Sequence, residues 1–591
     1  MILDWLVPRK GRGLCPGNWK RVITQQFSSH VVKYPRIVAF YNASSHRVTA
    51  CPMTKPRVLV VGSGLAGLTS AYLLRKEGCE VWLVEKSERL GFHSASVNIP
   101  VASESFGNSK SGTKKASSWV VDVPMRSFQG GYYPSLISLY RHLDLRLVPT
   151  HFTFSFSRSP LASPEVQQTY FIYNGANGLS IPSLPSSAWS SISAFSHGVA
   201  QFIYSTLCFI LLLLLSFLSW HRLFPSLLGH QCTLTTLRNT LSPLRLDAFI
   251  DDILVPIFSS VGTMTTRDVL GAPLPALLDY VHATLGTDHY ALGDGCSAST
   301  VADRLVRPIP AQGPGYLRLG ACIVQLTHDR GDVIATLQDG EEIAVDKVVL
   351  ATQASSAKAL LQMLRPSLSG NEERRVESVV NALEGVEYRE TIVVTHRDRS
   401  ILPSPRDTRN INFILPEPAD ESSVPTPALS SSTSSPYSSV TGTPVDSETL
   451  PPLAPYFATT RDKVYTMATH VVDPPRSLRN EAQVLQTTNP VMPIDRSCIL
   501  GTARLERALP IRDPALFDRL HPRSKSAVVY LAGSYAYPGI PLLEGCVGSA
   551  KRAAEAVLGE RLDDLGGVDW SVGQGGVLGR LWRWRSRKAV I

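Results

Sequence analysis

The sequence lacks the features that mark several classes of protein. Its nine cysteines are scattered and none forms a C-x-x-C pair, which points away from a disulfide framework and from a zinc site. The net charge of +9 is spread thinly, and no basic stripe interleaved with aromatic residues indicates a nucleic-acid partner. We find no Ser/His/Asp set and no metal-ligand spacing. We therefore expect no bound metal.

The two ends of the chain are basic and poor in acids. At 591 residues the chain is long enough for two intertwined domains. Residues 1–55 precede the first expected strand and hold one acid, Asp4. This composition fits either a transit peptide for an organelle such as the mitochondrion, or a disordered extension, and we favour the extension. The C-terminal tail, residues 561–591, is basic, and its segment 581–588, LWRWRSRK, either contacts anionic lipid or is disordered.

The most regular stretch of the chain is residues 57–85, RVLVVGSGLAGLTSAYLLRKEGCEVWLVE. Its apolar start predicts a buried parallel strand, and a helix is expected from about Leu65 to Lys76. A second strand is expected over residues 80–84, and it ends at an acid, Glu85. Between the first strand and the helix lie three glycines in the spacing G-x-G-x-x-G, namely Gly62, Gly64 and Gly67.

Each part of this stretch suits a dinucleotide. Gly62 allows a sharp turn off the strand, Gly64 lets a pyrophosphate approach the backbone, and Gly67 lets the helix pack closely on the strand. The helix N-terminus, at Leu65 and Ala66, offers free N–H groups to the phosphates. Glu85 lies where a carboxylate can accept ribose hydroxyls, and its charge would repel the 2′-phosphate of NADP. The motif alone leaves NAD and FAD open.

The segment after Glu85 carries a family resemblance. Residues 88–93 read ERLGFH, and an aspartate stands before a later helix. This order resembles the flavin-containing amine oxidase and phytoene desaturase superfamily, and within it the "amine oxidase domain" proteins of bacteria and fungi. Members have a second glycine where this chain has Phe92, and many have arginine where it has His93. The resemblance implies an α/β fold: a Rossmann-like FAD-binding domain built from discontinuous segments, with an inserted mixed α+β substrate domain.

Two later segments resemble the remaining parts of that FAD domain. Residues 316–352 predict strands around an Asp339-Gly340 hairpin turn. Residues 528–558 predict a strand, a loop and a long helix, whose N-terminus would point at the flavin N1 and O2 edge. The resemblance implies a cofactor site for FAD that is formed by Gly62, Gly64, Leu65, Ala66, Gly67, Glu85, Lys86, His93, Ile323, Gly533, Ser534, Glu544 and Val547.

The domain boundaries follow from these segments. We expect the FAD-binding domain at residues 56–150, 293–365 and 521–560. The substrate domain would take residues 151–292 and 366–520. It would include a Ser-, Pro- and Thr-rich insertion at residues 416–456, which cannot bury enough apolar surface to order itself.

One apolar segment indicates a membrane. Residues 202–220, FIYSTLCFILLLLLSFLSW, are 19 residues without a charge, long enough to cross a hydrocarbon core of about 30 Å. A single span would put the two halves of the nucleotide site on opposite sides of the membrane. We therefore prefer a helix that dips into, or lies against, one leaflet, with a buried core helix as the alternative. A membrane-associated protein is expected.

The resemblance implies an FAD-dependent oxidoreductase that transfers hydride from an amine or lipophilic substrate to flavin N5. Leu542 and Leu543 stand where amine oxidases commonly present an aromatic residue. An apolar site beside a membrane helix fits a lipophilic small molecule better than a polyamine. The alternatives are a desaturase or isomerase-like flavoenzyme acting on an isoprenoid or lipid, and a flavin-binding membrane protein without activity. Phe92 stands in place of the usual glycine, and its bulk would crowd the cofactor. This departure keeps open the alternative of a flavin-binding protein without activity.

Overall fold

The computed structural model describes residues 55–100, 118–123, 127–150, 152–160, 167–175, 180–311, 313, 315–417, 465–478, 481–520 and 527–572. Residues 1–54 lie outside this range. The predictions for the N-terminal extension, for the tail segment 581–588 and for residues 418–456 of the insertion therefore lie outside the described residues. Residues 416 and 417 are described, and they form the end of a strand rather than the start of an insertion.

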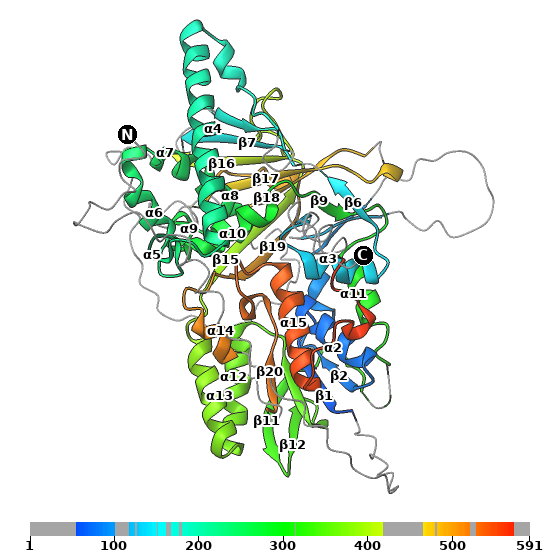
Figure 1. The fold of residues 1–591 in the computed structure, drawn as a ribbon. Helices are drawn as coiled ribbons and strands as arrows, with labels where there is room; N and C mark the ends of the chain where they lie inside the picture. Colours follow the sequence, from blue (N-terminus) through cyan, green and yellow to red (C-terminus); the bar gives the residue numbers. More distant parts are fainter. Residues whose placement is uncertain are drawn as a thin grey trace, which may run out of the picture. The chain divides into compact units, whose positions relative to one another are not determined.

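A five-stranded parallel sheet lies at the centre of the first domain (Figure 1). Its order is β10-β2-β1-β14-β20, and all neighbouring strands are parallel. The strands come from three separate parts of the chain, which confirms the predicted discontinuous Rossmann-like architecture. Their bounds are β1 (Arg57–Val61), β2 (Glu80–Val84), β10 (Leu317–Arg318), β14 (Lys347–Leu350) and β20 (Val529–Leu531).

Helices cover one face of this sheet. Their apolar sides and the sheet form the first core cluster, in which Val58, Leu68 and Leu73 are fully buried. The expected helix after the glycine motif has the predicted bounds, because the motif and the apolar residues that specify it are local in sequence. The helices are α2 (Leu65–Lys76), α3 (Pro134–His142), α11 (Ala298–Val306) and α15 (Leu543–Leu558).

A second layer covers the other face. An antiparallel sheet, β11 (Ile323–Asp329), β12 (Asp332–Leu337) and β13 (Glu342–Val345), packs there with α12 (Ala354–Leu364), α13 (Gly370–Leu383) and α14 (Ala515–Leu520). The Asp339-Gly340 turn joins β12 to β13 as expected, and Gly340 has a φ of +88°. Because α13 contributes Val376 and Val379 to this cluster, the first domain extends beyond the boundary that we placed at residue 366.

The second domain is built on a seven-stranded mixed sheet of order β19-β15-β18-β17-β16-β7-β8. Most neighbours are antiparallel, whereas β16 and β7 are parallel. In the sequence, two strands of this sheet precede the middle segment of the first domain, which holds β10 and β14, and the other five strands follow it. The strands are β7 (Phe154–Pro160), β8 (Gln168–Tyr173), β15 (Tyr388–His396), β16 (Ile411–Glu417), β17 (Met467–Val472), β18 (Val484–Thr488) and β19 (Ile499–Ala508).

A group of helices packs beside this sheet and forms the third core cluster. The longest, α4 (Ile192–Trp220), begins where the Ser191 hydroxyl accepts the Ala194 N–H at 3.1 Å. It lies against α10. The other helices are α5 (Pro225–Leu228), α6 (Leu234–Thr240), α7 (Asp247–Phe249), the π-helix η5 (Ile250–Leu254), α8 (Val255–Gly262), α9 (Thr266–Gly271) and α10 (Leu274–Thr284).

Two small antiparallel sheets complete the described fold. One pairs β3 (Val97–Pro100) with β4 (Ser118–Val121), and its apolar side packs on β18 and β19. The other has the order β5-β9-β6, with β5 (Phe128–Gln129), β6 (Leu147–Thr150) and β9 (His289–Leu292). These sheets bring residues of the first domain against the second.

Strands of one sheet come before and after α4 in the sequence. β8 precedes α4, β16 follows much later in the chain, and β7 pairs with both. A crossing by α4 with no second crossing before β16 would therefore put strands of one sheet on opposite sides of a membrane. α4 is the single helix among the described residues that is long and apolar enough to cross a membrane, and a third of its most apolar window is buried in the protein. Length and apolarity alone do not distinguish a membrane helix from a core helix.

Candidate functional site

The glycine loop between β1 and α2 has the shape of a phosphate-binding turn. Gly62 has a φ of +99°, in the left-handed region that favours glycine. A Cβ on Gly67 would overlap the carbonyl oxygen of Gly62, so α2 can approach the loop this closely only without a side chain there. A Cβ on Gly64 would meet no atom within 4 Å. Gly64 therefore faces open space, where a ligand can approach the backbone.

Glu85 lies at the end of β2 beside this loop and is buried, with an exposed fraction of 8%. One carboxylate oxygen accepts the backbone N–H and the hydroxyl of Ser63, both at 2.8 Å. The other accepts the N–H of Ser87 at 3.0 Å. A carboxylate offers about four acceptor positions, so the second oxygen retains capacity for a ligand hydroxyl. Sequence reasoning missed Ser63, although it lies inside the glycine motif.

The segment from Leu90 to His93 lies over the glycine loop. Gly91 donates its N–H to the Ser63 hydroxyl at 2.7 Å. A Cβ on Gly91 would lie 3.5 Å from the Gly64 nitrogen. Phe92, whose bulk we expected to crowd a cofactor, packs against the first core cluster. The backbone of His93 belongs to a short 3-10 helix, and its side chain lies outside the described residues.

The chain around β10 lies at the Glu85 end of the sheet. The N–H of Ala321 donates to the Glu85 carbonyl, and that of Gly320 to the Ser87 carbonyl, both at 2.9 Å. Ile323 begins β11 two residues later, is buried, and pairs with Leu337. The structure thus brings the predicted Ile323 segment next to the predicted ribose-binding acid.

The third segment forms the turn between β20 and α15. Gly533 donates its N–H to the Ser549 hydroxyl at 2.9 Å, which ties the turn to the helix. A Cβ on Gly545 would lie 2.8 Å from the Ser534 carbonyl oxygen, so the glycine allows the first turn of α15 to lie against Ser534. Val547 is fully buried in the first core cluster. Its side chain is structural, and only its backbone is left to face a ligand.

Glu544 has a different partner from the one that we predicted. Its carboxylate accepts the backbone N–H groups of Ser135 and Leu136, both at 3.0 Å. These belong to the first turn of α3, whose preceding residue, Tyr133, supplies no side-chain cap. The carboxylate of Glu544 therefore joins α15 to α3. The distance in sequence explains why no local pattern could show this.

The remaining predicted residues divide into two groups. Leu65 and Ala66 are buried in the first turn of α2, so only their backbone can serve a phosphate. Lys86 is exposed just past β2. Among the described residues, no group of three or more His, Cys, Asp or Glu side chains could hold a metal ion.

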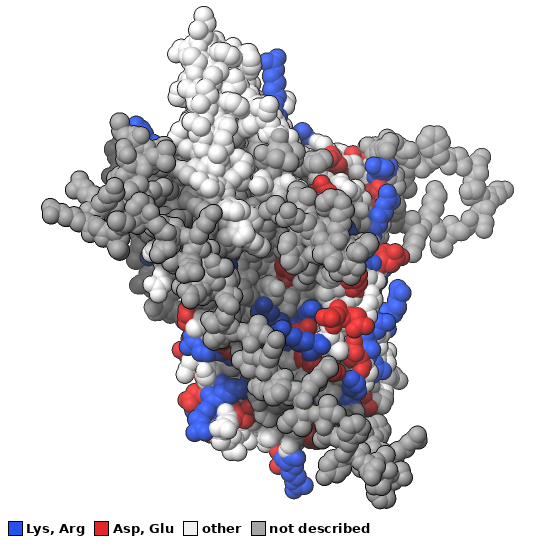
Figure 2. Space-filling view, viewed as in Figure 1, with Lys and Arg blue, Asp and Glu red and all other residues white. Residues whose placement is uncertain are grey.

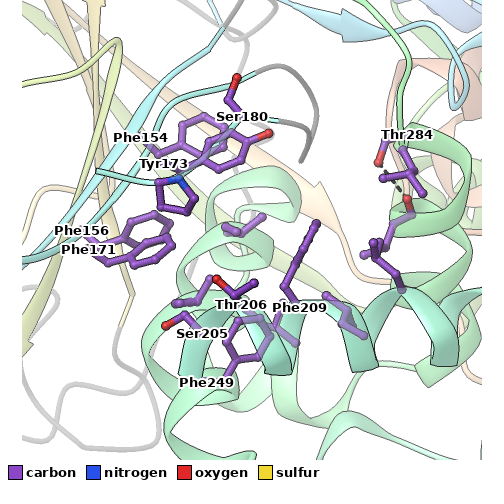
Figure 3. Close-up of a pocket in the computed structure, with 18 of the residues that line it drawn as sticks. Phe154, Phe156, Phe171, Tyr173, Ser180, Ser205, Thr206, Phe209, Phe249 and Thr284 are labelled. Atoms are coloured by element: carbon purple, nitrogen blue, oxygen red, sulfur yellow. Dashed lines mark hydrogen bonds between the residues drawn. The ribbon is translucent and has the colours of Figure 1, made fainter. Parts of the chain in front are cut away.

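A cavity of about 340 Å³ lies between α4, α10 and the strands β7 and β8 (Figure 3). Aromatic and aliphatic side chains form most of its wall, with Phe154, Phe156 and Phe171 on the strands and Phe209 on α4 (Figure 3). Volume and lining are those of a site for a small apolar molecule. The sequence indicated an apolar site here only because the apolar segment 202–220, which lies in α4, was expected beside the substrate.

One side of this cavity is polar. Gln129 and His289 line it, and the Gln129 side-chain nitrogen lies 2.6 Å from His289 Nε2. The side-chain oxygen of Gln129 is buried and has no hydrogen-bond partner in the described structure. A buried acceptor without a donor is costly, so a ligand that carries an N–H or O–H group would be favoured there.

Two tyrosines connect this cavity to the start of α15. Tyr280 lines the cavity, and its ring centroid lies 4.6 Å from that of Tyr132. The Tyr132 hydroxyl accepts the Ile540 N–H at 2.9 Å, and both Tyr132 and Leu542, the residue before α15, pack against the first and third core clusters. Tyr280 and Tyr132 therefore link the cavity wall to the chain that precedes α15.

These features fit FAD. The open space at Gly64 suits a pyrophosphate, and the free acceptor capacity of Glu85 suits a ribose hydroxyl. The turn at Gly533 and the N-terminus of α15 complete a binding surface that spans three segments of the chain. A nicotinamide dinucleotide alone would not need the third segment.

A comparison with protein families supports a dinucleotide site in the first of these three segments, which contains the glycine loop. Residues 60–143 match the family model described as "NAD(P)-binding Rossmann-like domain". No curated protein matches the chain in sequence.

Solved structures give a weaker likeness over a longer range. Cyclohexylamine oxidase from Brevibacterium oxydans IH-35A is 12% identical, with a TM-score of 0.46, and the match covers 85% of this chain and 99% of that one. Putrescine oxidase in its wild-type form bound to putrescine is 10% identical, with the same TM-score of 0.46, and the match covers 85% and 99%. Because these TM-scores are low, we draw no function from them. The sequence match and the geometry of the glycine loop together identify residues 60–143 as a Rossmann-like dinucleotide-binding segment.

Proposed function

We propose that the protein is an FAD-dependent oxidoreductase that oxidises a lipophilic small molecule. The observation that carries the proposal is the convergence of three distant segments: the glycine loop with Glu85, the chain around Ile323, and the turn from Gly533 to α15. Bound there, FAD would supply a hydride acceptor at N5 and would be reoxidised by oxygen or another acceptor. The chain's own residues bind the cofactor, orient the substrate and exclude water.

The substrate class follows from the cavity beside α4. Its aromatic and aliphatic wall favours an apolar body, and the free side-chain oxygen of Gln129 favours a head group with an N–H or O–H. A lipophilic amine or alcohol meets both conditions. A hydrocarbon such as an isoprenoid would leave the Gln129 oxygen unpaired, which makes desaturation the second candidate.

Contact with a membrane is part of the same proposal. Along α4, five apolar side chains at helical spacing are largely exposed, namely Ile203, Leu207, Ile210, Leu214 and Phe217. Figure 2 shows no charged side chains over α4 on this face. Exposed Trp189 and Trp220 flank the helix, as aromatic residues do at a membrane surface. Because strands that precede and follow α4 in the sequence belong to one sheet, the helix would lie in a single leaflet.

The first experiment is the visible spectrum of the protein purified in mild detergent, before and after acid precipitation. A flavin spectrum that appears in the supernatant supports noncovalent FAD. Anaerobic addition of long-chain amines and alcohols should then bleach the flavin, whereas short polyamines should not. Protein that binds no flavin after FAD has been supplied would refute the proposal. Flavin that no substrate of either class bleaches would favour a flavin-binding protein without this activity.

A further inference from the structure

Ser205 places a hydroxyl group in the apolar part of the cavity beside α4. The residue lines this cavity (Figure 3), and its exposed fraction is 3%. Its hydroxyl oxygen is buried and has no hydrogen-bond partner among the residues that the structure describes. A buried hydroxyl without a partner retains its cost of desolvation, so this group does not stabilise the fold in the absence of a ligand.

Other hydroxyl groups on α4 do have acceptors. A serine or threonine inside a helix commonly donates its hydroxyl to a carbonyl about one turn earlier. Thr206 donates to the Phe202 carbonyl, and Ser216 to the Leu213 carbonyl, both at 2.8 Å. In the described part of the chain Ser205 makes no such bond. Its hydroxyl is therefore available to a molecule in the cavity.

The polar pair of Gln129 and His289 lies away from Ser205. Thr287, two residues before His289, donates its hydroxyl to the carbonyl of Thr284 at 2.8 Å, so the pair follows closely on the C-terminal end of α10. Figure 3 shows Thr284 and Ser205 on opposite sides of the view. The two polar groups that lack a partner therefore lie at different ends of one apolar cavity.

Strand β7 gives the scale of this separation. Just before the strand, the ring of Phe152 packs edge-on against His289, with centroids 5.6 Å apart. Near its other end, Arg158 pairs with Asp252 of η5 at 2.5 Å. A strand rises about 3.3 Å per residue, so roughly 20 Å separate these two contacts. The wall of the cavity therefore extends from the polar pair to η5.

Ser205 belongs to the η5 end of this wall. The hydroxyl of its neighbour Tyr204 accepts the N–H of Phe249 at 3.2 Å, and Phe249 immediately precedes η5. Figure 3 shows Ser205 beside Phe249. The side chains of Phe154 and Phe156 on β7 line the cavity between this end and the polar pair. A molecule that contacts both polar ends must therefore have an apolar middle.

The end with the polar pair is the one connected to the candidate flavin site. The Gln129 carbonyl accepts the N–H of Tyr132 at 3.2 Å. The Tyr132 hydroxyl in turn accepts the N–H of Ile540, which lies shortly before α15. The head group that is oxidised would therefore lie near Gln129, and Ser205 would meet the opposite end of the substrate.

We propose that Ser205 binds a second polar group, at the end of the substrate remote from the flavin. This inference rests on the proposed function and narrows its substrate class to a lipophilic chain with a hydroxyl or carbonyl oxygen at that end. A serine hydroxyl can both donate and accept, so it suits either group. A simple alkyl amine or alcohol would leave Ser205 unpaired, and a site with an unpaired buried hydroxyl discriminates against such a ligand.

The test measures how strongly the protein prefers a ligand with two polar ends. The full chain in lipid nanodiscs is titrated calorimetrically with decylamine and with ω-hydroxydecylamine, and then with decanol and with decane-α,ω-diol. Wild type is compared with Ser205→Ala. Ser216→Ala is the matched control, because Ser216 is also buried on α4 but donates to Leu213 and lies outside the lining of the cavity. Partition of each ligand into lipid is the same for all three proteins and cancels from the comparison.

We expect wild type to prefer the ligand with two polar ends in at least one of the two pairs. Ser205→Ala should lose roughly 3- to 10-fold of that preference, the range for one hydrogen bond between uncharged groups. Ser216→Ala should keep it. Without ligand, the Tm of Ser205→Ala should equal or exceed that of wild type, because the substitution removes an unpaired buried hydroxyl.

Several results would overturn the inference. A preference that is absent from wild type, or unchanged in Ser205→Ala, would show that Ser205 does not contact the ligand. An equal loss in Ser216→Ala would assign the effect to α4 as a whole. If wild type bound none of the four ligands, the cavity would not be the substrate site and the proposed substrate class would fall with it. Flavin that stays oxidised while the preference depends on Ser205 would support this contact and count against the proposed activity alone.

Discussion

The carboxylate of Glu544 accepts the backbone N–H of Leu136 at 3.0 Å, although 408 residues separate the two in sequence. This hydrogen bond and its neighbour at Ser135 join α15 to α3 at the edge of the candidate flavin site. The residue that was predicted to serve the cofactor directly therefore holds the helices that surround it.

Removing this carboxylate should destabilise the fold. Glu544→Ala leaves two backbone N–H groups of α3 without their acceptors, and we expect a loss of about 1–3 kcal/mol in the free energy of unfolding. Glu555→Ala is the control, because Glu555 lies on the same helix and forms only a pair with Lys551 at 3.5 Å. Chemical denaturation would measure both. An equal loss in the two variants would contradict the role of Glu544.

The same residue should make stability depend on pH. Burial raises the pKa of Glu544 above its ordinary value of 4.5, and the hydrogen bonds from Ser135 and Leu136 offset part of the rise. The folded protein therefore retains a proton that the unfolded chain releases. The resulting stabilisation is fully present below about pH 4.5 and is lost as the pH rises through the folded-state pKa. Because glutamine cannot ionise, the Tm of Glu544→Gln relative to wild type should rise over this window. Parallel pH profiles would count against it.

The second and third glycines of the motif should respond differently to a methyl group. Gly64→Ala meets no atom within 4 Å and should fold, yet it should lose FAD because the methyl group occupies the space for the pyrophosphate. Gly67→Ala would overlap the carbonyl of Gly62 and should destabilise the fold by more than about 4 kcal/mol. Thermal unfolding and the flavin-to-protein absorbance ratio distinguish these outcomes. Full flavin occupancy in Gly64→Ala would place the cofactor elsewhere.

The link between β16 and β17 should be removable. The two strands pair as an antiparallel hairpin, Ile411 with His470 and Ile414 with Met467, so their connected ends are neighbours. Deletion of residues 420–462 leaves a short link that can close this hairpin. We expect a Tm within a few degrees of wild type and unchanged flavin content. Aggregation would show that the deleted segment is part of the fold.

The exposed stripe of α4 should bind lipid. Ile210→Glu places a charge on a side chain that is 58% exposed, and its control, Val324→Glu, does the same at 53% on β11. Vesicle sedimentation should show that the first variant binds roughly tenfold more weakly or worse, since burying an isoleucine contributes about 1.5–3 kcal/mol. The control should bind as wild type does. Equal binding by all three proteins would remove the membrane from the proposal.

Sequence reasoning succeeded where the determinants are local. The glycine spacing and the adjacent apolar runs predicted α2 and β2 with the bounds that the structure has and β1 to within one residue, and Asp339-Gly340 predicted its hairpin turn. Each of these elements is specified by residues within a few positions of one another.

It failed where a residue's partner is distant in sequence. In sequence α13 is an amphipathic helix, and only the fold shows that it packs with α12 and α14 in the core cluster that β11 and β12 share. The first turns of α4 hold Ser193 and Ser196, whose polarity hid the true start of the helix at Ile192.

The pairing of β14 with β20 has a consequence for how the protein is made. The sheet cannot acquire its last strand, nor the candidate site its third wall, until about nine-tenths of the chain has left the ribosome. By then α4, with its exposed apolar stripe, has long been synthesised. If the secretion machinery captured α4 as a spanning helix at that stage, β8 and β16 would be stranded on opposite sides of a bilayer and could not join one sheet. If α4 contacts lipid as we propose, the chain must therefore avoid the capture of α4 as a spanning helix before the sheet has formed.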